Sequence, residues 1–361
     1  MKRMVWIVSS VIFVVLVLGT FVHPVLAAPK ILKCSAIFTV ASPNYFCPTW
    51  FANEFEKRTK GAYKVDFYKG GTLGKGPDLV RLCGDGTVDF VVLALGYNPN
   101  LWILSRCWEL MYITDNTFAN AAAAWDMVLN YAPLHNEWER NGLIPTIVQP
   151  VGNMAAQSKT PINKVEDLKG LKVRGYAAVV KLIQRWGAIP IAISFPEVYD
   201  ALNRGLIHGA FGVPYQEVYA ARFFEVAPYV FDTGVGAYGM NVMATSKKTY
   251  DSFPPDVKKI FDQLVEEGKG YFRTWNESYN KEMTVKMINE KSIKFNIWSK
   301  EEKARAKSMA VPYIYEDWLK EAKDANLPGE ETLETYKKLI AKYELQYPCT
   351  LGFDTYKSLK K

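Results

Sequence analysis

The sequence predicts an α/β protein of two lobes braced by one long helix. Strand-like apolar segments alternate with helix-like segments over 31–94 and again over 165–215, an order typical of a mostly parallel sheet with helices on both faces. The chain beyond residue 28 has about 330 residues, which suggests about two domains. A helical pattern over 254–283 is longer than one small domain needs, so this helix could lie against both lobes.

The N-terminal 28 residues have the features of a secretory signal peptide. Lys2 and Arg3 precede an apolar run over 4–22, which Pro24 ends, and small residues follow at the positions that a signal peptidase reads. An uncleaved membrane anchor is the alternative, because the run approaches the ~20 residues that cross a bilayer. We expect residues 1–28 to be removed as the protein is exported.

The first lobe is predicted to comprise 29–151 and 238–278. Residues 63–68 alternate between apolar and polar side chains, as a strand with one exposed face should, and the apolar run over 88–94 is typical of a buried strand. The other elements expected before residue 94 are a strand over 31–38 and helices over 47–58 and 77–83.

The second lobe is predicted to comprise 152–237 and 279–361. Ser194 and Glu197 have the spacing of a capping box at the start of a helix, which Gly205 should end. The other elements expected here are strands over 171–174 and 207–212 and helices over 179–186 and 330–343. In the long helix, apolar residues recur at steps of three or four from Val257 to Met283.

Two glycine-rich segments resemble nucleotide-binding loops but lack the context that such loops need. Residues 234–239 fit G-x-G-x-x-G, yet 240–244 form a strand-like run where a dinucleotide site needs a helix N-terminus. Residues 70–76 resemble a P-loop, but Lys69 replaces its first glycine and Gly76 replaces the hydroxyl residue that holds magnesium. We therefore expect a crossover between lobes at 234–239 and no nucleotide cofactor.

No motif indicates an enzyme or a nucleic-acid partner. H-E-x-x-H and G-x-S-x-G are absent, and the formal net charge of +7 is spread along the chain without a basic block. The acidic pairs 266–267 and 301–302 are interpreted as solvated charges on helix faces.

Five cysteines leave at least one thiol outside any intramolecular disulfide, and inert burial or structural pairing is expected. We predict no cofactor and no metal; an enzyme built on the same two lobes is the alternative class.

The most distinctive segments are 167–174, 195–202 and 205–210, with weaker matches at 84–89 and 250–255. Together they resemble the extracytoplasmic solute receptors of tripartite ATP-independent periplasmic (TRAP) transporters, the DctP-type family, over nearly the whole mature chain. The resemblance implies a two-lobed periplasmic binding protein fold, with crossing strands, a ligand cleft between the lobes and a long helix as a spine. It also implies a periplasmic protein that hands a small carboxylate ligand to TRAP membrane subunits.

By this resemblance, Arg174 matches the arginine that clamps the ligand carboxylate. A guanidinium fork pairs with a carboxylate through two hydrogen bonds, and burial makes such a pair strong and directional. The alternative is a structural arginine that pairs with a local acid such as Asp167 or Asp200. A receptor that presents its ligand to a membrane sensor is a further alternative, which a neighbouring permease gene would distinguish from a transport protein.

The sequence departs from the family pattern at two places that bear on the ligand. Relatives often place a second arginine or a glutamine about twenty residues before Arg174, and many have Gln-Glu-Asn after the position of Gly209. Here Asn153 and Phe211 lie in these regions, which favours a monocarboxylate, such as a 2-oxo or aromatic acid, over a C4-dicarboxylate. The predicted ligand-binding residues are Arg174, Asn153, Gln157, Phe211, Gly212, Tyr215, Tyr97 and Asn241.

Overall fold

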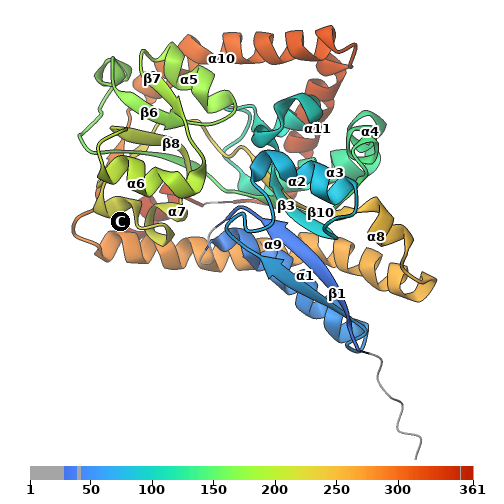
Figure 1. Cartoon of the computed structure of the whole chain (residues 1–361). Coiled ribbons are helices and arrows are strands. Elements are labelled where there is room, and N and C mark those ends of the chain that lie inside the picture. The colour runs from blue at the N-terminus through green and yellow to red at the C-terminus, as the bar shows by residue number, and fades with distance from the viewer. Residues whose placement is uncertain (1–27, 39–41, 350, 361) are drawn as a thin grey trace, which may run out of the picture.

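The computed structural model describes residues 28–38, 42–349 and 351–360, and these form two lobes, each built on one sheet (Figure 1). The two-lobed α/β fold predicted from the sequence is confirmed. The predicted signal peptide lies outside the described residues, apart from its last residue. No helix in the described part of the chain combines the length and the apolar character that a membrane span requires.

The first sheet has the strand order β2-β1-β3-β10-β4. Strand β1 is parallel to β2 and β3, whereas β10 is antiparallel to β3 and β4. Its strands are β1 (Lys30–Ala36), β2 (Tyr63–Tyr68), β3 (Phe90–Ala94), β4 (Leu143–Pro150) and β10 (Met240–Ser246). The helices of this lobe are α1 (Phe46–Arg58), α2 (Leu79–Gly84), α3 (Thr117–Asn130), α4 (Ala132–Arg140) and α8 (Lys247–Asp251).

The second sheet has the strand order β11-β9-β5-β8-β6-β7. Its strands are β5 (Met154–Ser158), β6 (Lys172–Gly175), β7 (Ile189–Ala192), β8 (Gly209–Pro214), β9 (Tyr229–Asp232) and β11 (Lys294–Ile297). Its helices are α5 (Ala178–Arg185), α6 (Val198–Asn203), α7 (Glu217–Ala220) and α12 (Phe353–Leu359). The predicted capping box is present, since the Glu197 carboxylate accepts hydrogen bonds from the backbone and the hydroxyl of Ser194.

Both sheets are mixed, whereas the sequence predicted mostly parallel ones. The antiparallel pairs come from the strands that follow each crossing between the lobes. Strand β5 pairs antiparallel with β8 and β9, and β10 pairs antiparallel with β3 and β4. A strand that arrives from the other lobe enters without the helical crossover that a parallel neighbour requires, so its direction is free to reverse.

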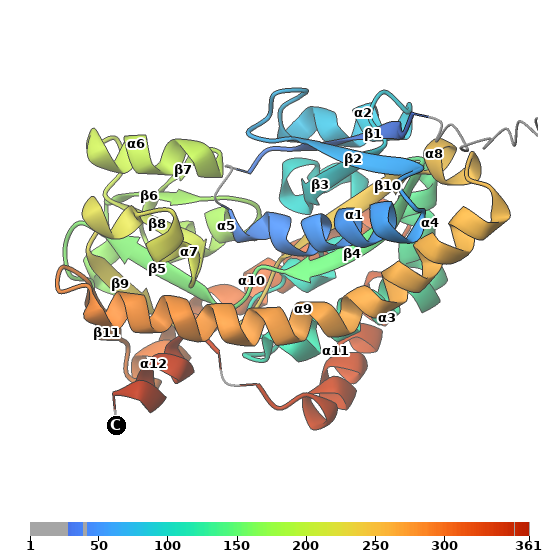
Figure 2. The ribbon, with the colours of Figure 1, turned by 90° about the horizontal axis from the view of Figure 1, so that it is seen from below.

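Helix α9 (Pro255–Asn289) is the predicted spine and has 35 residues, a length of about 52 Å. It packs against α1 and β4 of the first lobe and against α7 and α12 of the second. Figure 2 shows it running beneath both lobes. The prediction of one helix that spans both lobes is therefore confirmed.

A second long helix, α10 (Lys300–Asp324), also contacts both lobes and was not predicted. It begins at the second lobe and runs toward the first, along the top of Figure 1. In its second half, the Tyr315 hydroxyl donates to the Met111 carbonyl at 2.8 Å, and the Trp318 indole donates to the Ile103 carbonyl at 2.7 Å. The sequence did not predict α10 because one of its faces is polar and because Pro312, a residue that disfavours the interior of a helix, lies within it.

Helix α11 (Gly329–Gln346) packs against α3 of the first lobe. Its residues belong to the range 279–361, which the sequence analysis assigns to the second lobe. An amphipathic helix shows which of its faces is buried, but its sequence does not say which lobe covers that face.

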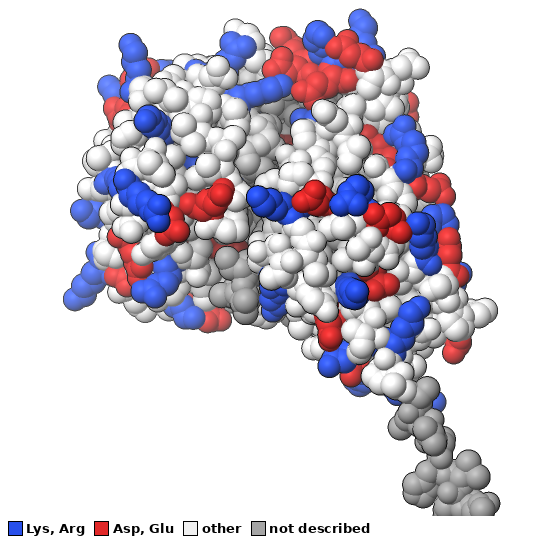
Figure 3. Space-filling view, in the orientation of Figure 1, with Lys and Arg blue, Asp and Glu red and all other residues white. Residues whose placement is uncertain are grey.

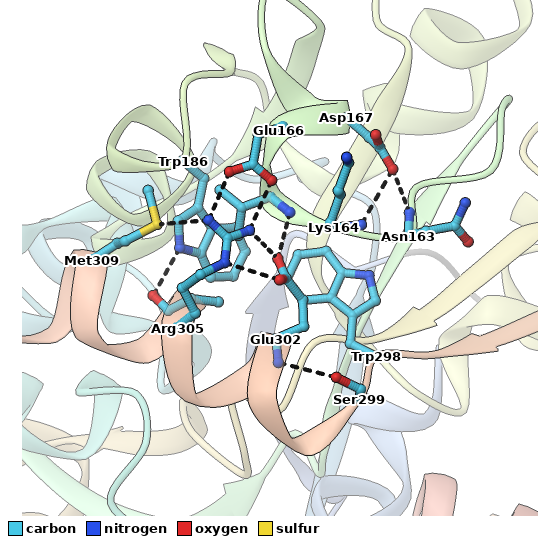
Figure 4. Close-up of polar contacts among 12 residues, drawn as sticks. Asn163, Lys164, Glu166, Asp167, Trp186, Trp298, Ser299, Glu302, Arg305 and Met309 are labelled. Carbon is cyan, nitrogen blue, oxygen red and sulfur yellow. Dashed lines mark hydrogen bonds and ion pairs between the residues drawn. The ribbon is translucent and has the colours of Figure 1, made fainter.

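Figure 4 shows the contacts that fix the start of α10 to the second lobe. Arg305 makes two hydrogen bonds to the Glu166 carboxylate, at 2.6 and 2.8 Å. The Glu302 carboxylate accepts from Arg305 at 2.7 Å and from the backbone N–H of Val165 at 2.7 Å. The interpretation of 301–302 as solvated charges is therefore wrong for Glu302, whereas Glu301 is exposed.

The five cysteines are free thiols, of which Cys34, Cys47, Cys83 and Cys107 are buried and Cys349 is partly buried. Burial raises the pKa of each of these thiols, that of Cys349 to about 11. The thiols are therefore unreactive at neutral pH.

Figure 3 shows positive and negative side chains interspersed over one face of the molecule, so the net positive charge does not gather into a patch there.

Replacing Glu302 with alanine should destabilise the protein by about 2 kcal/mol, because the Val165 N–H loses its acceptor and Arg305 loses one of its two carboxylates. The neighbouring exposed change, Glu301→Ala, is the matched control and should cost less than about 1 kcal/mol. Urea unfolding of both variants measures the difference. Equal losses would show that Glu302 contributes no more than a surface charge.

A buried carboxylate in the first lobe should make stability depend on pH. Glu109 is buried, and burial raises its pKa to about 7, although Arg106 opposes the shift from 3.7 Å. The folded chain therefore retains a proton that the unfolded chain releases near its ordinary pKa of 4.5. The contribution of Glu109 to the free energy of unfolding is fully present below about pH 4.5. This contribution, up to about 3 kcal/mol, is lost as the pH rises to about 7. Glu109→Gln should flatten this decline in urea unfolding between pH 5 and 7.5, whereas the exposed Glu330→Gln should leave it unchanged.

Candidate functional site

Arg174 is a buried cation at the end of β6, with 2% of its surface exposed. Its Nε donates to the Ile193 carbonyl at 3.3 Å, and its Nη1 lies 3.4 and 3.5 Å from the carbonyls of Phe211 and Gly212. These hydrogen bonds are long, so they satisfy the guanidinium only weakly. Burial lowers the pKa of Arg174, but an arginine keeps its proton in proteins.

The alternative pairing of Arg174 with a local aspartate is not found. The Asp167 carboxylate accepts instead from the backbone N–H groups of Asn163 and Lys164, at 2.7 and 3.2 Å. No carboxylate in the described part of the chain, Asp200 included, lies within ion-pair distance of Arg174 or contributes to its pKa. A charge held in this way raises the free energy of the folded protein until an anion reaches it.

Aromatic rings surround this charge. The centres of the Tyr176 and Phe195 rings lie 5.1 and 5.9 Å from the guanidinium carbon. Tyr97 of the first lobe faces Tyr176 of the second, with ring centres 6.4 Å apart and an angle of 27° between the planes. The rings line a cavity of about 40 Å³ between the lobes. The aromatic walls and the single buried cation suit a flat ligand with one anionic end.

A chain of buried polar side chains forms another part of the cavity wall. Asn241 on β10 donates from Nδ2 to Oδ1 of Asn44 at 2.6 Å, and Asn44 donates from Nδ2 to the Ser42 hydroxyl at 2.9 Å. The Ser42 hydroxyl donates in turn to Oε1 of Glu217 at 3.1 Å. The chain of hydrogen bonds thus crosses from the first lobe to α7 of the second. Burial raises the pKa of Glu217 to about 7, against the opposing hydrogen bond from Ser42.

The structure brings four of the predicted ligand residues to this cavity: Tyr97, Arg174, Gly212 and Asn241. Phe211 contributes only its carbonyl, because its ring packs against Trp186 at 6.1 Å. Sequence reasoning missed the lining residues Phe38, Asn44, Tyr176, Phe195 and Glu217. Tyr176 follows Arg174 by two positions, so period-two alternation along the strand could have indicated it. Burial of Glu217 had no signal in the sequence.

The remaining predicted residues lie away from the cavity. Gln157 on β5 is buried within the second sheet and donates to the Ala227 carbonyl at 3.3 Å. Tyr215 packs against Phe353, with ring centres 5.0 Å apart. Asn153 donates to the Asp115 carbonyl at 2.9 Å and lines a different cavity. We therefore leave these three side chains out of the proposed site.

The cavity beside Asn153 is larger, about 610 Å³, but it is a weaker candidate for a ligand site. Lys303 lies 2.5 Å from Asp232 and Lys357 lies 3.0 Å from Asp354, whereas Asp115 and Lys307, which have no ion pair in the described part of the chain, are exposed. Among the described residues, this cavity therefore offers no unpaired buried charge, in contrast to the Arg174 cavity. We take the Arg174 cavity as the candidate site.

The glycine-rich segment 234–239 is a crossover between the lobes, as expected. Gly234, Gly236 and Gly239 have φ values of 76°, 88° and 79°, which favour glycine. A β-carbon at Gly236 would lie 2.5 Å from the Thr114 carbonyl oxygen. Strand β10 follows directly, so no helix N-terminus is available for a pyrophosphate.

Comparison with known proteins agrees with this architecture. The family model of the bacterial extracellular solute-binding proteins, family 7 (DctP), matches residues 40–321. The chain is 24% identical over 325 residues to the C4-dicarboxylate-binding periplasmic protein DctP of Rhodobacter capsulatus. The alignment covers 88% of this chain and 93% of the relative.

Two solved structures share the fold. A TRAP solute binding protein from Rhodoferax ferrireducens in complex with benzoate has a TM-score of 0.79 at 23% identity, over 88% of this chain and 99% of the other. A marine metagenome TRAP solute binding protein specific for aromatic acid ligands, in complex with 3-hydroxybenzoate, has a TM-score of 0.78 at 23% identity, over 88% of this chain and 100% of the other. With the family match over most of its length, the chain belongs to family 7 of the bacterial extracellular solute-binding proteins, the DctP-type receptors of TRAP transporters.

Proposed function

We propose that this protein captures a small organic acid with one carboxylate, in particular an aromatic or 2-oxo acid, and delivers it to the membrane subunits of a TRAP transporter. The observation that carries this proposal is the buried Arg174, which has no carboxylate partner among the described residues and faces an aromatic cavity between two lobes. A ligand carboxylate would supply the missing anion through two hydrogen bonds.

The cavity favours a monocarboxylate over a C4-dicarboxylate. Arg174 is the single cationic side chain among the described residues that line it, and residues 39–41, outside the described part, are uncharged in the sequence. A second carboxylate would approach Glu217 or the aromatic rings, where it would lose its hydration without gaining a cation. Relatives bind ligands of both kinds, since one is named for C4-dicarboxylates and another holds benzoate.

Two further parts of the proposal rest on the sequence and the family. The basic and apolar N-terminus supports export to the periplasm by a cleaved signal, as the extracytoplasmic role of the family requires. Membership of the family supports delivery to membrane subunits. Presentation of the ligand to a membrane sensor is the alternative role, and a permease gene beside this one would favour transport.

A thermal-shift screen of organic acids should give stabilising hits among monocarboxylates, with aromatic and 2-oxo acids foremost. A ligand at 100 times its Kd adds about 2.7 kcal/mol to the free energy of unfolding, which such a screen detects. Succinate and malate serve as dicarboxylate controls. Hits confined to neutral sugars or to amines would exclude a carboxylate ligand.

Arg174→Ala should weaken binding of the best acid by about 2–5 kcal/mol, which is roughly 30-fold to several thousand-fold in Kd. Arg174→Lys should restore only part of the loss, because an ammonium lacks the planar fork. The unliganded Arg174→Ala protein should be at least as stable as the wild type, because the change removes a buried charge that only long hydrogen bonds satisfy.

Titration calorimetry and thermal melts of the unliganded variants measure both effects. Arg204→Ala, at an exposed arginine of the same lobe, is the matched control and should bind as the wild type does. An Arg174→Ala protein with wild-type affinity, or one that fails to fold, would remove Arg174 from the ligand site.

A further inference from the structure

The same cavity holds a second ionisable side chain, Glu217, whose carboxylate has an unused acceptor position. Glu217 has 3% of its surface exposed and lines the cavity. Its Oε1 accepts from the Ser42 hydroxyl at 3.1 Å, and no other hydrogen bond to its carboxylate is found among the described residues. A ligand donor inside the cavity would therefore find Oε2 available as its acceptor.

The direction of the hydrogen bonds fixes what Glu217 can offer. The Ser42 oxygen accepts from the side-chain amide of Asn44 at 2.9 Å and from its backbone N–H at 3.3 Å. Its two lone pairs are thereby used, so its single proton points to Glu217 Oε1. Above about pH 7, where Glu217 is ionised, it ends this chain as an acceptor, and its Oε2 is the position left for a ligand.

Arg174 and Glu217 both line the cavity, but they do not pair with each other. They form no ion pair, and neither contributes to the pKa of the other: that of Arg174 responds to burial and nearby tyrosines, and that of Glu217 to burial and Ser42. A ligand in this cavity would therefore meet a cation for its carboxylate and a separate carboxylate acceptor.

We propose that Glu217 selects ligands that carry, besides the carboxylate that Arg174 holds, a hydrogen-bond donor such as a hydroxyl or an ammonium group. This inference rests on the proposed function. A site that lines up a buried acceptor discriminates strongly against an analogue without the donor, because the acceptor then stays unpaired. Glu217 is thus the residue that sets the preference, and Arg174 supplies affinity for every acid alike.

The test compares matched acids that differ in one donor. Calorimetry with benzoate, the three hydroxybenzoates and 3-(aminomethyl)benzoate should show at least one donor-bearing acid bound about tenfold or more tightly than benzoate by the wild type. Glu217→Leu should abolish this preference, so that benzoate and its donor-bearing analogues bind the variant with similar affinities. Glu217→Gln should retain part of the preference for a hydroxyl and lose any preference for an ammonium. Glu225→Gln, a change to a nearby glutamate that pairs with Arg222 and does not line the cavity, should change neither affinity.

The outcomes separate this inference from the proposed function. If acids bind through Arg174 but no donor-bearing acid is preferred, or if the preference persists in Glu217→Leu, this inference fails and the proposed function stands. If no acid binds the wild type, or if Arg174→Ala binds acids as well as the wild type does, the proposed function fails. A preference for the hydroxyl or for the ammonium identifies which donor the cavity accepts.

Discussion

A guanidinium ion that is buried without a counter-ion raises the free energy of a folded protein, and the rest of this structure keeps Arg174 in that state. The long hydrogen bonds to three carbonyls orient the side chain without neutralising it. The aromatic rings exclude water and give the charge weak favourable contacts. The folded chain is therefore prepared for an anion before the anion arrives, which lowers the reorganisation that binding requires.

Holding such a charge in place requires lobes that meet in a defined way. Helices α9 and α10 each contact both lobes, and two segments of chain near residues 151–153 and 236–240 cross between them. The long helices have many contacts to each lobe, whereas the crossings contain glycines at Gly152, Gly236 and Gly239 with positive φ. Long helices that support both lobes, combined with glycine-containing crossings, are suited to a hinge motion that opens and closes a cleft.

The polar chain from Asn241 to Glu217 lines the same cavity as Arg174. It joins the two lobes through the hydrogen bond between Ser42 and Glu217, so the same side chain contributes to closure and faces the ligand space. Glu217 is costly to bury, as its raised pKa shows. The cavity thus contains one unpaired cation and one under-used acceptor, and a single ligand with both complementary groups would satisfy them together.

The sequence by itself determined the two-lobed α/β fold, the spine helix and the role expected of Arg174, because periodicity and a family motif are local properties of the chain. It also identified Tyr97, Gly212 and Asn241 as candidates that the structure brings to the cavity. Only the tertiary structure decided that Asn153, Gln157 and Tyr215 lie elsewhere, that α11 packs on the first lobe, and that Glu217 is buried in the cleft. These facts depend on which surfaces meet after folding, and nothing in the local pattern around a glutamate in a four-residue helix records what covers it.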